Sequence, residues 1–401
     1  MKTDIAIIGG GIVGCAAAYF LAKKGLRALV IEKDPAVGLQ ASGRNGGGVR
    51  QQARKAALPL AMESVKLWTT LSRELDADLE YIQTGNLKIA LDETSAATCE
   101  QELAWEHANG LSEVRLISAA ECQAFLPGIT GKILLGKFCP SDGIANPMRV
   151  TPAFARACLK LGVKFLLNTA VTGLLRQGPT VCGVKTASDE IEAQAVINTA
   201  GPWAARFNAE AGCPIVIGPG RSQLLITERL PRPFINNWIT ISGLGYLRPT
   251  RSNNLAIGSA GTRNDQYSYD VNHHYSAVQA DRLSKLIPWL RDLAVIRAFA
   301  GITEYTPDGE PYIGAVPGAP GFYVAAGFHG AGFCPGPLTG KILADLIFGN
   351  EPCVSLEPFR PDRFARALKA REAIPPIVYP FDKMYEAWLA DINIPYTEFG
   401  N

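Results

Sequence analysis

The chain opens with an apolar strand, a glycine-rich turn and an apolar helix in direct succession. Residues 5–8 (IAII) are uniformly apolar, which is typical of a strand covered on both faces. Residues 16–22 are rich in alanine and leucine and predict a helix that ends at Gly25. A second strand is predicted at residues 27–31, with Glu32 at its end. The N-terminal segment therefore predicts a βαβ unit.

The rest of the chain alternates between helical and strand-like patterns. Turns are predicted at Gly178, Gly243 and Asn253, where glycine or asparagine interrupts the apolar pattern. The predicted helices span residues 53–75, 99–110, 118–125, 149–161 and 277–290. The predicted strands span residues 164–167, 170–175, 191–197, 215–227 and 238–257, and residues 79–91 predict a strand or a hairpin that turns at residues 84–86.

The composition is that of a well-packed globular protein. Of 401 residues, 47% are hydrophobic and 19% are charged, and the formal net charge is +2. Neither disorder nor a basic nucleic-acid surface is indicated. The nine cysteines occur singly, without the paired spacing of zinc or iron–sulfur ligands, and we expect no metal site. No targeting or membrane-spanning segment is evident, so we expect a cytoplasmic protein with reduced thiols.

The turn after the first strand has the glycine spacing of a dinucleotide-binding site. In G-x-G-x-x-G, Gly9 allows the tight turn, Gly11 lets a pyrophosphate approach the backbone, and Gly14 lets the helix pack closely on the strand. The start of the helix offers free N–H groups to phosphate. Glu32 is placed to accept hydrogen bonds from ribose hydroxyls and would repel the 2′-phosphate of NADP. NAD and FAD both remain open on this evidence.

A glycine-rich loop follows Glu32 and extends the candidate site. Residues 38–52 read GLQASGRNGGGVRQQ, whereas a nicotinamide dehydrogenase would run on directly to its third strand. Such a loop brings backbone amides against an anion or a flat ring. The alternative is a flexible surface loop.

Taken together, these motifs and five later segments resemble the FAD-dependent superfamily of D-amino-acid oxidase, glycine oxidase and sarcosine oxidase. The resemblance covers most of the chain and implies an α/β fold, in which a Rossmann-like FAD-binding domain is interleaved with an antiparallel-sheet α+β substrate domain. The later segments are CPSDGIANP (139–147), VINTAGPWA (196–204), GYLRPTRSNNLAIG (245–258), GITEYTPDGEPYIG (301–314) and GFYVAAGFHGAGFCPGPLTGKILADLI (321–347).

The resemblance implies FAD and assigns residues to it, and we expect the FAD to be non-covalent, because nothing in the spacing of Cys334 and His329 requires a covalent bond. The expected FAD-binding domain comprises residues 1–78, 145–212 and 319–355, and the substrate domain residues 79–144 and 213–318. Residues 356–401 form a tail rich in proline and aromatic residues, which either packs along the body or contacts another chain. The expected cofactor-binding residues are Gly9, Gly11, Ile12, Val13, Gly14, Glu32, Lys33, Ser42, Arg44, Asn45, Gly46, Gly47, Val171, Ala200, Gly201, Trp203, Gly327, His329, Gly330, Ala331, Gly332 and Phe333.

Four further residues are candidates for the chemistry. Arg50 follows the glycine loop, and its guanidinium can hold a substrate carboxylate through two hydrogen bonds; the alternative is a structural arginine. Tyr246 and Arg248 are two apart in a predicted strand, so they share a face, and each has either a pocket or a structural role. His329 either hydrogen-bonds the flavin or is structural, while the amides of residues 330–333 would stabilise negative charge on the reduced flavin.

The segment that starts at Gly301 departs from the glycine-oxidase pattern. It lacks the arginine that binds the carboxylate in those enzymes, and Glu304 brings a carboxylate instead. We expect Glu304 either to bind a substrate cation or to pair with a nearby arginine. The form of this segment is similar to that of the β subunits of sarcosine oxidase and of dye-linked proline dehydrogenase. Related enzymes include hydrogen cyanide synthase, opine oxidases and D-hydroxyproline dehydrogenase.

The resemblance therefore predicts the catalytic subunit of a hetero-oligomeric dehydrogenase. It would oxidise the C–N bond of glycine, an imino acid, a D-amino acid or an opine by hydride transfer to flavin N5. Electrons would leave through FMN or an iron–sulfur centre of a partner subunit. The alternatives are a self-sufficient oxidase that produces peroxide and a non-catalytic subunit that carries FAD as a scaffold.

Overall fold

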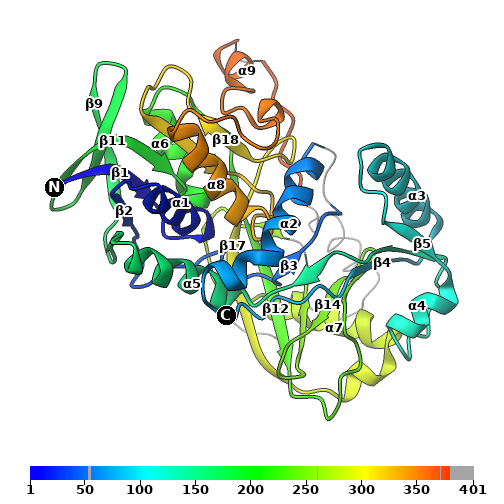
Figure 1. The fold of residues 1–401 in the computed structure, drawn as a ribbon. Helices are drawn as coiled ribbons and strands as arrows, with labels where there is room; N and C mark the ends of the chain where they lie inside the picture. Colours follow the sequence, from blue (N-terminus) through cyan, green and yellow to red (C-terminus); the bar gives the residue numbers. More distant parts are fainter. Residues whose placement is uncertain (53–55, 260, 371, 380–401) are drawn as a thin grey trace.

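The computed structural model describes residues 1–52, 56–259, 261–370 and 372–379, and it places two sheets in neighbouring lobes (Figure 1). The first sheet has the order β18-β19-β11-β1-β2-β8, and all neighbours on this path are parallel except β18 and β19. The antiparallel pair β9 and β10 extends from β11. The strands of this sheet are β1 (Lys2–Ile8), β2 (Ala28–Ile31), β8 (Lys164–Leu166), β9 (Val171–Gln177), β10 (Thr180–Thr186), β11 (Glu190–Asn198), β18 (Tyr312–Ala315) and β19 (Phe322–Ala326).

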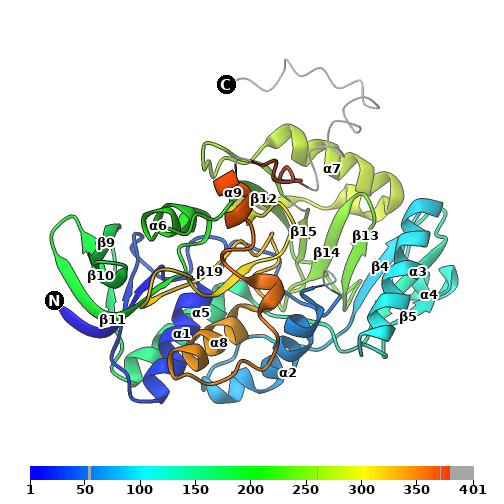
Figure 2. The same cartoon turned by 90° about the horizontal axis from the view of Figure 1, so that it is seen from above.

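Helices cover both faces of the first sheet, which explains why residues 5–8 of β1 and all of β2 are apolar. Helices α1 (Ile12–Lys23), α5 (Pro147–Lys160) and α8 (Gly336–Ile347) lie on one face, and α6 (Ala204–Glu210) lies on the other (Figure 2). Ile7 belongs to the core under α1, whereas Ile8 belongs to the core on the opposite face. α1 and α8 pack closely, since a Cβ at Gly340 would lie 2.5 Å from the backbone nitrogen of Ala17. The predicted βαβ unit is therefore confirmed.

The second sheet has the order β16-β12-β15-β14-β13-β4-β6-β5, with β17 paired to β12. Its pairs are antiparallel, as predicted, apart from the parallel pair β13 and β4. The strands are β4 (Asn86–Ala90), β5 (Arg115–Ile117), β6 (Leu135–Cys139), β12 (Gly218–Thr227), β13 (Trp238–Ile241), β14 (Gly245–Pro249), β15 (Leu255–Gly258), β16 (Thr262–Arg263) and β17 (Val295–Tyr305).

The pleat of the second sheet separates an apolar face from a polar one. Trp238 lies opposite Asn86 in the register, and Thr240 lies opposite both Lys88 and Tyr246, so these side chains share one face. The intervening residues form a separate core with α4 (Ala119–Phe125) and α7 (His273–Leu286). That core includes Leu87, Ile89, Ile239, Ile241, Leu247 and Ile257.

The remaining elements connect the lobes or cap them. Trp68 in α2 donates a hydrogen bond from Nε1 to the carbonyl oxygen of Cys334 (2.8 Å), which ties this helix to the segment before α8. The elements that connect or cap the lobes are α2 (Leu58–Glu74), α3 (Glu93–Ala108), α9 (Ala365–Ala370), β3 (Gly48–Val49), β7 (Gly143–Ile144) and three 3-10 helices at Gly201–Trp203, Pro288–Asp292 and Glu357–Phe359.

Several predicted elements need correction. Of the two alternatives for residues 79–91, a strand or a hairpin, the hairpin was wrong: a single strand forms at Asn86–Ala90, and it pairs with β6 and β13. The helix predicted at residues 99–110 begins earlier, since Asp92 and Ser95 form a capping box. The helix predicted at residues 277–290 ends at Leu286, before Pro288. Residues 53–55, at the start of the first predicted long helix, lie outside the described residues.

One strand crosses the predicted division into domains. β18 joins the first sheet although it falls within residues 213–318, the stretch predicted for the second domain; the division itself stays a prediction.

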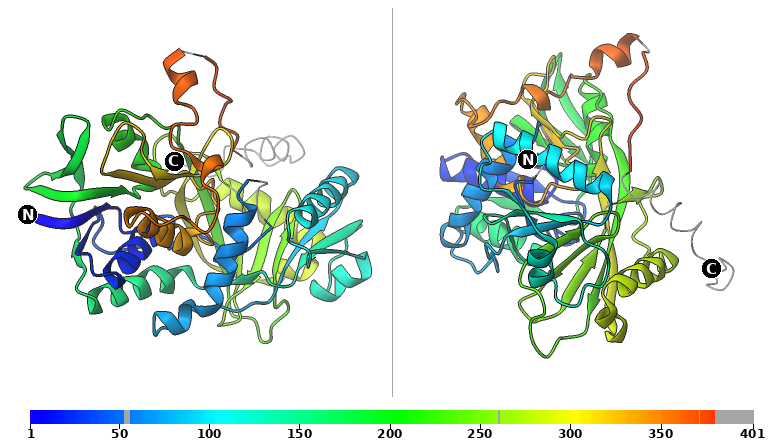
Figure 3. Two further views of the ribbon diagram at one scale, coloured as in Figure 1. Left: turned by 45° about the horizontal axis from the view of Figure 1, so that its top comes forward. Right: turned by 90° about the vertical axis from the view of Figure 1, so that its right-hand side faces the viewer.

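After α9 the chain returns toward the junction of the lobes (Figure 3). There the ring of Tyr379 lies 5.2 Å from that of Tyr305, and a Cβ at Gly218 would overlap the Tyr379 hydroxyl. The described part of the tail therefore packs along the body.

Candidate active site

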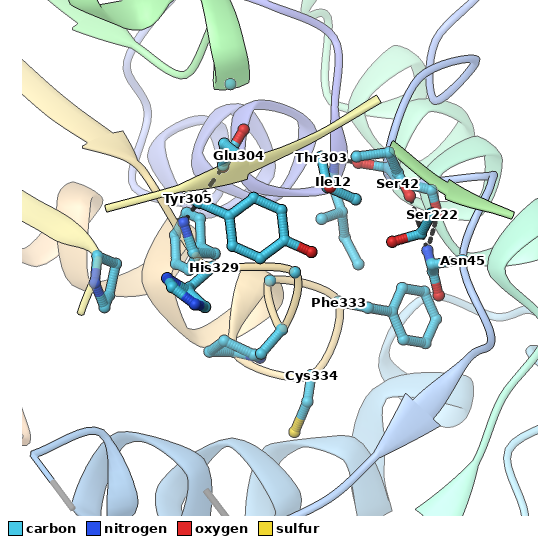
Figure 4. A pocket seen from close by; sticks show the side chains of 18 of the residues that line it. Ile12, Ser42, Asn45, Ser222, Thr303, Glu304, Tyr305, His329, Phe333 and Cys334 are labelled. Carbon is cyan, nitrogen blue, oxygen red and sulfur yellow. Dashed lines mark hydrogen bonds between the residues drawn. The ribbon is translucent and has the colours of Figure 1, made fainter. Parts of the chain in front are cut away.

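A large cavity lies where the two sheets meet. Its volume is about 1120 Å³, which exceeds the range of about 300–1,000 Å³ that holds drug-sized ligands. Its wall combines the turn after β1, residues 40–48, the first residues after β11, the polar face of the second sheet and residues 328–335 (Figure 4). The dinucleotide turn and the second sheet therefore share one cavity.

The glycine turn holds the start of α1 against β1. A Cβ at Gly14 would overlap the carbonyl oxygen of Gly9 and lie 2.7 Å from the Thr199 hydroxyl, so any side chain there would displace the helix. The N-cap of α1, Gly11, carries no capping side chain, and it lines the cavity with its backbone. This arrangement matches what a pyrophosphate requires of a helix N-terminus.

The carboxylate of Glu32 is fixed at the end of β2. Its Oε2 accepts a hydrogen bond from the amide of Gly10 (2.6 Å), and its Oε1 accepts one from the amide of Asp34 (2.9 Å). Burial raises the pKa of Glu32, and these two amides act in the opposite direction. Nearby, the Lys33 ammonium lies 4.6 Å from the centre of the Trp203 ring. This end of the cavity offers the carboxylate and aromatic groups that suit a ribose and an adenine.

The glycine loop is held in a defined shape by its own polar groups. Asn45 donates from Nδ2 to the carbonyl oxygens of Ala41 and Ser42, both at 2.9 Å, and accepts from the amide of Gly47 (2.7 Å). The Ser42 hydroxyl accepts a hydrogen bond from the amide of Ile12 (2.9 Å), which joins the loop to α1. The alternative of a flexible surface loop is therefore not what the structure shows.

Arg50 lies at the junction of this loop with the second sheet. Its guanidinium carbon is 4.7 Å from the centre of the Trp238 ring, and that ring stacks on Tyr246 at 4.0 Å. Within the described chain, no hydrogen bond or ion pair is formed by the guanidinium. Burial lowers the pKa of Arg50, and the negative charge of Asp142 acts in the opposite direction. The Arg50 guanidinium thus lines the cavity, and its N–H groups are available to a ligand.

Glu304 makes contacts that neither sequence expectation anticipated. Its Oε1 accepts hydrogen bonds from the amides of Gly327 (3.1 Å) and Phe328 (3.3 Å). It forms no ion pair with an arginine among the described residues, so the expected arginine pairing was wrong. Burial raises the pKa of Glu304 to about 7, although the two amides favour the ionised form. Glu304 therefore holds the loop at residues 327–328 against β17.

His329 occupies an unusual backbone position beside this loop. Its φ is +53°, in the left-handed region, and its ring lies edge-on to Tyr305 at 4.6 Å. Its Nδ1 accepts from the amide of Thr306 (3.4 Å), while the Tyr305 hydroxyl accepts from the amide of Gly261 (2.8 Å). These contacts fix the imidazole in the cavity wall (Figure 4).

The structure brings most of the predicted site residues to this one cavity. Arg50, Tyr246, Glu304 and His329 line it, whereas Arg248 is not among its lining residues and donates from Nη1 to the carbonyl oxygen of Pro249 (3.0 Å). The predicted cofactor-binding residues that line the cavity are Gly9, Gly11, Ile12, Val13, Glu32, Lys33, Ser42, Arg44, Asn45, Gly46, Gly47, Val171, Ala200, Gly201, Trp203, His329, Gly330, Ala331, Gly332 and Phe333; Gly14 and Gly327 do not.

Sequence reasoning missed Trp238, Thr240 and Thr303, which also line the cavity. Trp238 and Thr240 belong to the same alternating strand, and that alternation was the available signal for a polar face. Thr303 directly precedes Glu304, and no motif singles out its hydroxyl.

The described residues contain neither a metal-binding cluster nor a membrane-spanning helix. In residues 1–52, 56–259, 261–370 and 372–379, no group of three or more His, Cys, Asp or Glu side chains is arranged to hold a metal ion. Over the same ranges, no helix has both the length and the apolar character needed to cross a membrane.

Comparisons with known proteins agree with the site. The family model for FAD dependent oxidoreductases matches residues 4–346. The chain is 30% identical to hydrogen cyanide synthase subunit HcnC of Pseudomonas protegens, over 91% of this chain and 97% of that protein. It is 28% identical to glycine oxidase of Geobacillus kaustophilus, over 89% and 96%. Its fold matches the crystal structure of L-proline dehydrogenase from P. horikoshii with a TM-score of 0.86 and 32% identity, over 91% and 98%.

The glycine turn, the fixed carboxylate of Glu32 and the ordered glycine loop fit FAD, and the family match covers all three. The chain therefore belongs to the FAD dependent oxidoreductase (DAO) family, as the resemblance predicted, and is an FAD-dependent enzyme of the kind that oxidises amino acids at a carbon–nitrogen bond.

Proposed function

We propose that the chain oxidises the C–N bond of an amino acid or N-substituted amino acid whose carboxylate is bound by Arg50. The observation that carries this proposal is the Arg50 guanidinium, which lines the cavity and has no hydrogen-bonding partner in the described chain. Every candidate substrate class, namely glycine, imino acids, D-amino acids and opines, presents a carboxylate beside an amine nitrogen. A guanidinium binds such a carboxylate in a fixed orientation through two parallel hydrogen bonds.

The surrounding residues supply the rest of the substrate environment. Trp238 and Tyr246 form an aromatic wall beside Arg50. Burial raises the pKa of Tyr246 to about 12, so its hydroxyl stays neutral and can donate a hydrogen bond. The same low polarity favours a substrate amine that has lost its proton. When bound, the flavin would accept the hydride equivalent from the substrate.

The cofactor is proposed to bind without a covalent bond to the chain. The cysteine nearest to the predicted flavin loop is Cys334, and burial raises the pKa of its thiol to about 12. At neutral pH it is therefore a thiol rather than the reactive thiolate. Gly9 to Glu32 would hold the AMP half and the pyrophosphate, and the loops at residues 42–47 and 327–333 would hold the ring.

The chain is proposed to act as the catalytic subunit of a hetero-oligomer that passes electrons to a partner's FMN or iron–sulfur centre. Its relatives include a protein named as a subunit, HcnC of Pseudomonas protegens, and this supports the proposal. The alternative is a self-sufficient oxidase that reduces oxygen to peroxide, which the similarity to glycine oxidase supports. The third possibility, a non-catalytic subunit that carries FAD, requires that no substrate reduces the flavin.

Anaerobic reduction of the flavin tests the site. At least one member of the four substrate classes should reduce the flavin of the wild-type protein and so bleach its absorbance. Arg50→Ala should retain FAD but bind that substrate at least about 100-fold more weakly, because two charge-assisted hydrogen bonds together contribute about 3–6 kcal/mol. Arg251→Ala is the matched control, because Arg251 is an exposed arginine that pairs with Asp78. An unchanged apparent affinity in Arg50→Ala would refute the clamp.

Peroxide measurement separates the two catalytic alternatives. The isolated chain, given a reducing substrate in air, should release little peroxide if a partner subunit is its electron acceptor. Rapid, stoichiometric peroxide would instead establish the self-sufficient oxidase.

A further inference from the structure

One carboxylate oxygen of Glu304 has no partner in the described chain and remains open to the cavity. Its Oε1 accepts hydrogen bonds from the amides of Gly327 and Phe328, whereas no described residue donates to its Oε2. Glu304 is only 8% exposed, and it lines the cavity. The Thr303 hydroxyl is sealed inside the protein, but Oε2 of Glu304 is not, so a ligand in the cavity can reach this oxygen.

Glu304 lies between two parts of the cavity that are assigned to different parts of FAD. A Cβ at Gly201, in the turn after β11, would be 2.9 Å from its Oε2. In the same turn, the Thr199 hydroxyl donates to the carbonyl oxygen of Gly9 (3.2 Å), so this turn adjoins the proposed pyrophosphate site. Through Oε1, Glu304 contacts the start of the loop at residues 327–333, which is proposed to hold the flavin ring.

The part of FAD that joins the pyrophosphate to the ring is the ribityl chain, which carries three hydroxyl groups. A hydroxyl both donates and accepts a hydrogen bond, so it can pair with Oε2 whether Glu304 is protonated or ionised. An ammonium group, in contrast, requires the ionised carboxylate, and burial opposes ionisation by raising the pKa of Glu304 to about 7. The environment of Glu304 therefore suits a hydroxyl better than a cation.

The substrate clamp lies in another part of the cavity. Arg50 rests on Trp238 of β13, whereas Glu304 belongs to β17, and the strands β14, β15 and β12 lie between them in the sheet. Four strand spacings correspond to about 19 Å along the sheet. An amino acid carries its amine on the carbon next to the carboxylate, so the amine of a substrate that is bound by Arg50 does not reach Glu304.

We infer that Glu304 binds the cofactor and not the substrate, through a hydrogen bond between its Oε2 and a hydroxyl of the ribityl chain of FAD. In the same position its Oε1 holds the loop at residues 327–328. The inference rests on the placement of the pyrophosphate and the ring in the proposed function. It does not depend on Arg50 or on which amino acid is oxidised.

FAD analogues that each lack one ribityl hydroxyl test the inference. Calorimetry on the FAD-free protein, without substrate, compares FAD with its 2′-, 3′- and 4′-deoxyribityl analogues. At least one analogue should bind the wild type at least 10-fold more weakly than FAD. Glu304→Met removes both oxygens at similar volume and should abolish most of this difference. Glu304→Gln can still accept from the two amides and donate to the hydroxyl, so it should retain part of the difference.

Glu210→Gln is the matched control for the loss of a carboxylate that accepts a backbone amide. Oε1 of Glu210 accepts a hydrogen bond from the amide of Leu174 (2.8 Å), and Glu210 does not line the cavity. This variant should bind FAD and each analogue as the wild type does.

Equal losses for the analogues in the wild type and in Glu304→Met would overturn the inference. Unchanged FAD affinity in Glu304→Gln together with weaker substrate binding would also overturn it, in favour of a substrate contact. If Glu304→Met retains no FAD, the comparison of the wild type with Glu304→Gln decides the outcome. If no amino acid reduces the flavin, the proposed function fails, whereas the analogue series needs no substrate and still decides the role of Glu304.

Discussion

Two charged residues of this site, Arg50 and Glu304, form no ion pair with any residue that the structure describes. The guanidinium of Arg50 rests on an aromatic ring, and the carboxylate of Glu304 accepts two backbone amides. Placing ionisable groups in this way is costly and is common where a ligand completes the set of contacts.

The pH dependence of stability should report the burial of Glu304. Burial raises the pKa of Glu304 from 4.5 to about 7. Between these values the folded chain binds a proton that the unfolded chain releases, so stability falls as the pH rises through this window, by at most about 3 kcal/mol. Denaturation of the FAD-free protein at pH 5 and pH 8 should therefore show a smaller loss for Glu304→Gln than for the wild type. Parallel profiles would contradict the assignment.

Trp238 should contribute to the binding of substrate and not to the binding of FAD. Trp238→Leu removes the ring beneath the guanidinium of Arg50, and a cation–π contact contributes about 0.5–2 kcal/mol. The apparent substrate affinity should fall roughly 2- to 30-fold in anaerobic reduction, with unchanged FAD content. Trp289→Leu, at the outer face of the second sheet, removes a tryptophan that stacks on Phe234 and should leave the substrate affinity as it is.

At the residue scale, a site residue could be predicted where it directly follows a recognisable motif. Arg50 was predicted because it follows the glycine loop, and it lines the cavity. The partners of Glu304 were not predictable, because they are backbone amides of the segment after β19, which belongs to the other sheet. Trp238 was overlooked because an aromatic residue in a strand is ordinarily part of a core.

At the scale of elements, local signals predicted helices and strands better than they predicted pairing. The capping box at Asp92 and the break at Pro288 define helix ends that simple periodicity misjudged. Of the strand or hairpin predicted at residues 79–91, only a strand forms, because the first half of the segment makes a single bridge, between Ile82 and Ile144.

The contact between α1 and the glycine turn should control FAD retention. A Cβ at Gly14 would overlap the carbonyl oxygen of Gly9, so Gly14→Ala must shift the helix N-terminus away from the phosphate position. We expect a lower ratio of FAD to protein, measured by absorbance after gel filtration. Gly25→Asn is the control. A Cβ added at Gly25 would meet no other atom within 4 Å, and asparagine tolerates the φ of +89° at this position. Normal FAD content in Gly14→Ala would contradict this role.

At the scale of the whole molecule, the decisive contacts are distant in sequence. The parallel pairing of β4 with β13 joins two segments into one cavity floor, and no local pattern predicts it. The resemblance supplied the two-lobed architecture that composition and periodicity alone left undecided.

The tail should add modest stability through Tyr379. Its ring packs against Tyr305, and aromatic pairs contribute about 0.5–1.5 kcal/mol. Tyr379→Ala should lower the Tm by roughly 2 °C. Val378→Ala is the matched neighbour, because Val378 is 56% exposed and should leave the Tm unchanged. An equal Tm for both variants would show that the aromatic contact is not stabilising.

The alternation along the second sheet has a consequence for how such an enzyme diversifies. Positions 86, 88, 238, 240 and 246 face the cavity, while the residues between them build the core. Preference for one amino acid over another can thus drift through substitutions at alternate positions while the folded scaffold is preserved. A mutant library confined to these five positions would sample new substrate ranges at little cost in folding yield.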